Sequence, residues 1–184
     1  MDEHESLRGH LLIASPALVD PNFRRAVVLV TEHTDEGAMG LVLNRPTEAT
    51  VVDAVPPLEE LVEPGACVHV GGPVQPSAVV VLAEFGDPEE SAALVIGDVG
   101  FVRADVEPGA LPESTRRARV FAGYAGWGEG QLEAELEEES WIVEPALVED
   151  VFAEDAEELW SRVLRRKGGQ YAVVALMPPD PSLN

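Results

Sequence analysis

The stretch AVVLVTEHTDEGAMGLVLN, residues 26–44, decides the fold class of this chain. Its first half, residues 26–33, is rich in β-branched residues, which is typical of a strand buried on both faces that fades to alternation near its end. Residues 34–37 predict a hairpin loop, because Gly37 is free to adopt a positive φ. Residues 38–44 return as a second strand, which Arg45 and Pro46 end, since proline lacks a backbone donor. The pattern predicts an antiparallel hairpin.

Further elements follow on both sides of this hairpin. Short apolar runs bounded by glycine or proline predict strands at residues 10–14, 67–70, 78–85, 94–96, 100–103, 117–125 and 141–144. Helices are expected at 57–62, from about residue 131, and at 155–167, while 106–115 fits either a loop or a weak helix. The helix at 155–167 is the best specified, because Asp155 can cap its start and Gly168 can end it.

The order of these elements indicates an α+β fold. Strands outnumber helices, antiparallel hairpins dominate, and there are no regular βαβ units or internal repeats. A length of 184 residues suits a single domain spanning 1–184, and 46% hydrophobic residues are enough for a core. We expect a mostly antiparallel sheet flanked by a few helices, with flexible tails at 1–6 and 178–184.

The charge of the chain is strongly negative. Twelve Lys and Arg residues against 34 Asp and Glu give a net charge of −22, and residues 129–158 hold 13 acidic residues and no basic one. Non-specific binding to nucleic acid needs Lys and Arg to displace counterions, so direct nucleic-acid binding is not expected. Short basic clusters at 24–25, 116–119 and 165–167 are interpreted as solvated helix ends and strand flanks, with a local basic face on a negative molecule as the alternative.

Cysteine usage and the N-terminal residues predict a cytoplasmic protein. Cys67 is the single cysteine, so no internal disulfide can form, which suits a reducing compartment. The first residues are acidic and lack the positive region of a signal peptide. No apolar run approaches the roughly 20 residues that span a bilayer, so no membrane association is expected.

The sequence carries no recognised catalytic motif. Lys167 is the only lysine and no phosphate-binding loop precedes it, and there is no nucleophile elbow, His-Glu-x-x-His motif or paired-cysteine metal site. No cofactor, metal or catalytic residue is therefore expected. Cys67 and His69 share a strand face, which fits either a thiol–imidazole pair or a small buried cysteine beside an incidental histidine.

Three segments hold residues that suit recognition. His33 and the pair Asn44–Arg45 are polar residues at the ends of an apolar hairpin, and loops carry function more often than cores do. Glycines at positions 71 and 72 allow close approach of a ligand or of a neighbouring strand. Residues 123–131 place the rings of Tyr124 and Trp127 among glycines ahead of a helix. This segment is either a binding loop or a helix-entry loop whose Trp127 fills the core. We expect the folded sheet to bring these segments together into one candidate binding surface, which comprises His33, Asn44, Arg45, Gly71, Gly72, Tyr124, Trp127 and Gln131.

The same segments resemble the YqgE/AlgH family. The matching motifs are LLIAxPxLxDxxFxR at 11–25, HxxxGAxGxVxNRP at 33–46, GGPV at 71–74 and GYAGWxxGQL at 123–132. The resemblance implies a compact α+β fold with a branched, largely antiparallel sheet. It also implies the family's label of transcriptional regulator, which rests on association with control of exopolysaccharide genes, and it supplies no catalytic residues. The chain departs from the family pattern at 106–115.

These observations favour a non-catalytic, cytoplasmic regulatory or binding domain. In this hypothesis Arg45 offers a fork for a carboxylate or phosphate, Asn44 and Gln131 supply amide hydrogen bonds, and Tyr124 and Trp127 supply flat contact surfaces. The partner is an unidentified protein or small molecule, and the oligomeric state is open. Two alternatives remain: a small enzyme with His33 as general base, and a regulator that binds DNA directly.

Overall fold

The hairpin at residues 26–44 forms at the centre of a large sheet. The structure, a computed structural model, describes residues 5–179, and most of the two predicted tails lies outside that range. The described strands are β1 (His10–Ala14), β2 (Val27–Thr34), β3 (Gly37–Val42), β4 (Pro46–Thr50), β5 (Cys67–Val70), β6 (Val74–Phe85), β7 (Ala93–Ile96), β8 (Val99–Phe101), β9 (Thr115–Trp127) and β10 (Trp141–Pro145).

The helices are short apart from one. They are α1 (Val51–Ala54), α2 (Leu111–Ser114), α3 (Gln131–Glu137), α4 (Val148–Val151), α5 (Ala156–Lys167) and α6 (Gln170–Val174), with 3-10 turns η1 (Pro56–Leu61), η2 (Pro88–Glu90) and η3 (Pro108–Ala110). The α+β prediction is confirmed. Along residues 5–179, none of these helices is long and apolar enough to cross a membrane.

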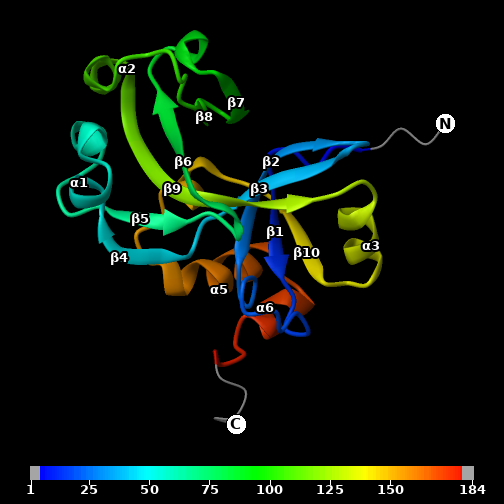
Figure 1. Ribbon diagram of the computed structural model, residues 1–184. Coiled ribbons are helices and arrows are strands. Elements are labelled where there is room, and N and C mark those ends of the chain that lie inside the picture. Colours follow the sequence, from blue (N-terminus) through cyan, green and yellow to red (C-terminus); the bar gives the residue numbers. More distant parts are fainter. Residues whose placement is uncertain (1–4, 180–184) are drawn as a thin grey trace.

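The sheet branches at its longest strand, β9. The main order is β10-β1-β2-β3-β9-β6-β8-β7, while β5 pairs with β9 in parallel and β4 pairs with β5. One edge of β9 pairs with β3 through its C-terminal residues and with β5 through its middle, and its other edge pairs with β6. Figure 1 shows β9 crossing the molecule with β4 and β5 on one side. The branched, mostly antiparallel sheet that the resemblance implied is therefore present.

Gly71 and Gly72 lie where β3 and β5 diverge from β9. The Gly71 amide donates to the Ala122 carbonyl at 2.9 Å, and the Gly71 carbonyl accepts from the Val42 amide at 2.8 Å. A Cβ added to Gly72 would lie 2.1 Å from the carbonyl carbon of Tyr124. The two glycines therefore serve the close approach of a neighbouring strand, because any side chain there would meet backbone.

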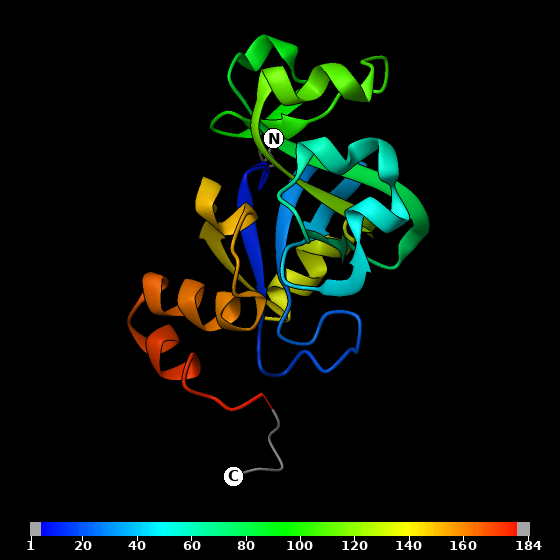
Figure 2. The ribbon, with the colours of Figure 1, turned by 90° about the vertical axis from the view of Figure 1, so that its left-hand side faces the viewer.

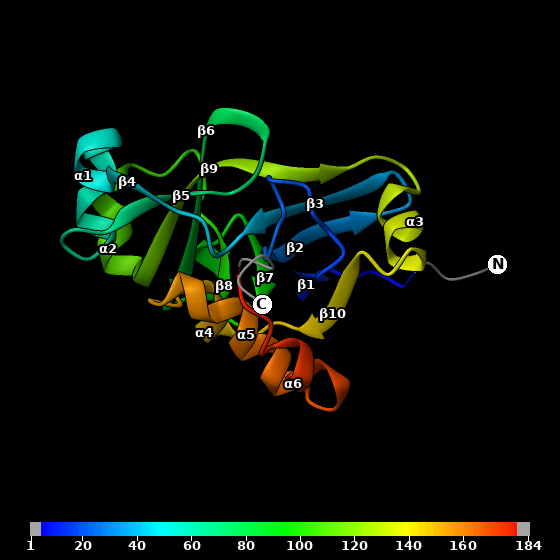
Figure 3. The same ribbon diagram turned by 90° about the horizontal axis from the view of Figure 1, so that it is seen from below.

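The central strands are covered on both faces, as the apolar run at 26–33 predicts. Alternate residues enter two separate cores: Leu29 packs with Trp160 of α5, whereas Val28 packs with Leu132 of α3. Since neighbouring strand residues point to opposite faces, α5 and α3 cover opposite faces of β1–β3. Figure 3 shows α5 and α6 grouped together on one side of these strands, away from α3.

Local signals place the helix at 155–167 and misplace several other boundaries. Asp155 caps α5 by accepting from the Glu158 amide at 3.2 Å, and Gly168 ends it with a φ of 79°. The returning strand does end before Pro46, since β3 stops at Val42, and Pro46 then begins β4, because a first strand position needs no N–H donor. The helix expected at 57–62 is the 3-10 turn η1, which the short helix α1 precedes, and residues 106–115, left as loop or weak helix, contain η3 and the whole of α2.

Candidate functional site

The candidate binding residues lie at three separate places in the fold, so they do not form the single surface that the sequence analysis expects. His33, Trp127 and Gln131 lie near α3, and Gly71, Gly72 and Tyr124 lie at the branch of the sheet. Asn44 and Arg45 lie at the open end of the hairpin, where Asn44 contacts Val27. The rise of a strand puts residues 27 and 33 roughly 20 Å apart, so an antiparallel hairpin separates His33 from Asn44.

His33 connects β2 to α3 and to the segment before β1. Its Nε2 lies 2.8 Å from Glu133 Oε1, and the Leu7 amide donates to its Nδ1 at 3.0 Å. Since Nδ1 accepts, Nε2 carries the proton that it donates to Glu133. The His33 side chain is 2% exposed, and both ring nitrogens are engaged. In this geometry neither ring nitrogen of His33 offers a free lone pair to a substrate, as the general-base alternative requires.

Trp127, which is buried, and Gln131, which is exposed, both hydrogen-bond within a network around Glu135. The Glu135 Oε2 atom accepts from the indole nitrogens of Trp127 at 2.6 Å and of Trp141 at 3.1 Å. The Gln131 side chain accepts from the Gly128 amide and donates to Glu135. Trp127 is 6% exposed, so its ring is a core plug and not a contact surface.

Cys67 and His69 do not form a thiol–imidazole pair. The His69 Nδ1 atom lies 3.2 Å from the Cys67 carbonyl, and the Cys67 thiol faces the Gly65 carbonyl. Burial, with the nearby Arg119 charge second, lowers the pKa of His69 from 6.5 to about 4. His69 is therefore neutral at physiological pH, with its proton on Nδ1.

We expect this buried imidazole to make stability fall with acidity. Between pH 6.5 and 4 the unfolded chain binds a proton at residue 69 that the folded chain rejects, so stability is lost as the pH falls through that window. The shift corresponds to a loss of about 2 kcal/mol by pH 4.5. Urea unfolding at pH 7 and pH 4.5 should show a smaller loss for His69→Gln than for the wild type. Equal losses would contradict this assignment.

Asn44 and Arg45 border a pocket of about 430 Å³ between the β1–β2 loop, the end of β3 and the start of α5. Its lining also includes Arg24, Arg25 and Trp160. Figure 2 shows the β1–β2 loop at the same end of the molecule as the C-terminal segment that follows α6. Residues distant in sequence therefore form one arginine-lined pocket.

Asn44 holds the loop that carries two of these arginines. Its Oδ1 accepts from the Val27 amide at 3.0 Å, and its Nδ2 donates to the Arg25 carbonyl at 2.8 Å. Arg25 has a φ of 55°, a left-handed conformation that is uncommon for a residue with a side chain. The side chain of Asn44 is thus a buried clamp that fixes the backbone of Arg25.

The three arginines of this pocket bond to backbone carbonyls. Arg24 donates to Pro179 at 2.6 Å, Arg25 donates to Met177 at 3.0 Å, and Arg45 donates to the Arg24 carbonyl. The Arg25 guanidinium also stacks 4.0 Å above the ring of Trp160. None of the three forms an ion pair with a carboxylate in the described part of the chain.

Burial opposes the charge of this cluster. It lowers the pKa of Arg45, and it lowers the pKa of Arg25 together with the repulsion from Arg24. A bound anion would relieve both effects. Sequence reasoning included Asn44 and Arg45 in the site but assigned Arg24 and Arg25 to solvated flanks. The sequence does not show that β3, running antiparallel to β2, brings residue 45 back beside residues 24 and 25.

Comparison with known proteins gives consistent matches along nearly the whole chain. A family model described as AlgH-like matches residues 11–172. A UPF0301 protein of Thermobifida fusca is 45% identical, covering 97% of this chain and 96% of the relative, and one of Streptomyces coelicolor is 47% identical, covering 100% and 98%.

Two solved structures share the fold. The crystal structure of protein DIP2367 from Corynebacterium diphtheriae has a TM-score of 0.86 at 27% identity, covering 96% of this chain and 95% of that one. The solution structure of the AlgH protein from Pseudomonas aeruginosa has a TM-score of 0.73 at 30% identity, covering 97% of each chain.

Proposed function

The chain belongs to the AlgH-like family, and from this premise we propose that it is a non-catalytic, cytoplasmic regulatory domain that binds an anionic ligand in the arginine-lined pocket. The observation that carries the proposal is the cluster of Arg24, Arg25 and Arg45 without a carboxylate partner among residues 5–179. In a chain with 34 acidic residues, partners of opposite charge are abundant, and other arginines use them.

The contrast with those other arginines is informative. Arg103 pairs with Asp105, Arg117 with Glu84 and Glu149, and Arg166 with Asp150. Each pocket arginine instead donates one hydrogen bond to a backbone carbonyl. Most of the five N–H groups of each guanidinium are therefore available to a ligand. Planar guanidinium forks match carboxylate and phosphate oxygens, so a small carboxylate or phosphate is the ligand class.

Regulation through this pocket would not require contact with DNA. The net charge of −22 repels a phosphate backbone at long range. The best candidate for a recognition helix, α5, buries Leu159, Trp160 and Val163 in the core. We therefore propose that a small anion, and not nucleic acid, is what the arginines recognise.

The test is binding of inorganic pyrophosphate and of citrate, measured by calorimetry at low ionic strength. We expect binding to the wild type and an affinity loss of about tenfold or more for Arg45→Met, because a charge-assisted hydrogen bond is removed. Arg162→Met is the matched control, because this substitution removes the same charge from an exposed position of α5 that lies outside the pocket.

A second variant tests the sign of the electrostatic argument. Glu157 is the carboxylate at the pocket lining, so Glu157→Gln should strengthen pyrophosphate binding. Circular dichroism should show that each variant is folded. Equal binding by the wild type and Arg45→Met, or no binding of either anion to the wild type, would refute the proposal.

A further inference from the structure

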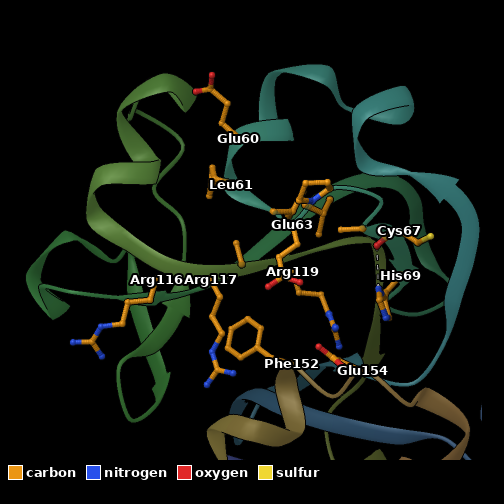
Figure 4. Close-up of a pocket in the computed structure, with 15 residues that line it drawn as sticks. Glu60, Leu61, Glu63, Cys67, His69, Arg116, Arg117, Arg119, Phe152 and Glu154 are labelled. Carbon is orange, nitrogen blue, oxygen red and sulfur yellow. Dashed lines mark hydrogen bonds between the residues drawn. The ribbon is translucent and has the colours of Figure 1, made fainter.

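A second hollow lies elsewhere in the molecule, between β9, the η1–β5 segment and residues 152–154. It has a volume of about 470 Å³ and shares no residue with the arginine-lined pocket. Figure 4 shows side chains from all three of these segments around it. Its lining mixes arginines of β9 with glutamates of the other two segments.

Arg119 supplies a fixed cation in this groove. Its Nη1 atom donates to the carbonyls of Val151 and Ala153, both at 2.9 Å, which anchors the guanidinium without neutralising it. Burial lowers the pKa of Arg119, with the nearby Glu154 charge opposing that effect. No carboxylate of the described residues lies within ion-pair distance of Arg119. Its remaining N–H groups are available to an anion.

Glu154 supplies an anion close to that cation without touching it. Its charge acts on Arg119, yet the two side chains form no ion pair. Figure 4 shows the Arg119 side chain extending between Phe152 and His69, with Glu154 beside its end. A ligand that carries both charges on neighbouring atoms can satisfy both groups at once.

His69 supplies a hydrogen-bond acceptor on the same wall. Because its Nδ1 proton is directed to the Cys67 carbonyl, its Nε2 carries the lone pair. The imidazole is neutral, so this nitrogen accepts from an N–H group and offers nothing to a carboxylate. Phe152 and Leu61 add apolar surface to the lining.

We propose that this groove binds a free α-amino acid through its zwitterionic head. Arg119 receives the carboxylate, Glu154 and His69 Nε2 receive the ammonium group, and the apolar lining contacts an uncharged side chain. The inference does not depend on the anion pocket, because the two hollows are lined by different residues.

The experiment screens each proteinogenic L-amino acid against the full chain by saturation-transfer NMR and measures the affinity of the best binder. The deaminated and the decarboxylated analogues of that amino acid are then compared with it. We expect at least one apolar amino acid to bind and each analogue to bind about tenfold more weakly or worse, since each lacks one of the two charged groups and its contacts.

Three variants test this groove, and two of them separate it from the arginine-lined pocket. Glu154→Gln should weaken amino-acid binding about tenfold and leave pyrophosphate binding unchanged. Glu157→Gln, an exposed glutamate outside the groove, should leave amino-acid binding unchanged. Arg119→Lys keeps the charge and should weaken binding by loss of the planar fork.

Three results would overturn the inference. The first is that no amino acid binds the wild type, and the second is that the deaminated carboxylate binds as well as the amino acid. The third is that Glu154→Gln and Glu157→Gln have equal effects on amino-acid binding. Failure of both pyrophosphate and citrate to bind would remove the proposed function and leave this inference intact.

Discussion

Replacing Gly72 with alanine is expected to destabilise the fold by about 4 kcal/mol or more, or to prevent folding. The added Cβ would lie 2.1 Å from the Tyr124 carbonyl carbon, 2.2 Å from its oxygen and 2.3 Å from the Ala125 nitrogen. All three are backbone atoms of β9, so no side-chain rotation relieves the clash. Urea unfolding followed by tryptophan fluorescence and circular dichroism measures the effect.

The cost is high because β9 cannot move aside. Residues 122–127 of β9 pair with β5, β3 and β6, and Gly71 bonds to both Ala122 and Val42. Relief of the clash must open at least one of these pairings. Gly109→Ala is the control, because a Cβ there meets nothing within 4 Å. Similar stability for the two variants would contradict this account of the sheet branch.

The sequence predicts those parts of the fold that local chemistry determines. The hairpin at 26–44 and the helix ending at Gly168 follow from residues that lie within a few positions of each other. The parallel pairing of β5 with β9 does not, because it joins segments about fifty residues apart through backbone atoms that any sequence supplies. The sequence shows that Gly71 and Gly72 allow a close approach, but it does not show that the approaching group is the backbone of β9, because that depends on the tertiary fold.

The candidate site was predicted in part, and the limit is again physical. A polar residue at a strand end suggests exposure, yet Asn44 is a buried clamp, and His33 and Trp127 are buried in internal networks. Side-chain burial depends on which loop folds back over the strand end. The prediction that Arg45 offers its fork to an anion stays a prediction, now supported by the position of Arg24 and Arg25 beside it.

Replacing Arg166 with methionine is expected to cost about 3–5 kcal/mol, because it leaves a buried carboxylate without its cation. Asp150 is 1% exposed, and its two oxygens accept from Arg166 at 2.9 and 2.8 Å. This contact raises the pKa of Arg166. The Leu147 amide would be the remaining donor to Asp150 among the hydrogen bonds of the described residues. Chemical denaturation at neutral pH measures the loss.

Arg165→Met is the matched control for this prediction. Arg165 is the neighbouring residue, and it pairs with Glu158 while both side chains are about half exposed, at 51% and 59%. Exposed pairs contribute less than about 1 kcal/mol, so Arg165→Met should be nearly neutral. Asp150→Asn combined with Arg166→Met should recover part of the loss, because the buried charge is removed while an acceptor for Leu147 remains. If the double variant is no more stable than Arg166→Met, an orphaned charge is not the cause.

Since Asp150 lies just before the carbonyls that anchor Arg119, Arg166→Met should also weaken amino-acid binding in the groove.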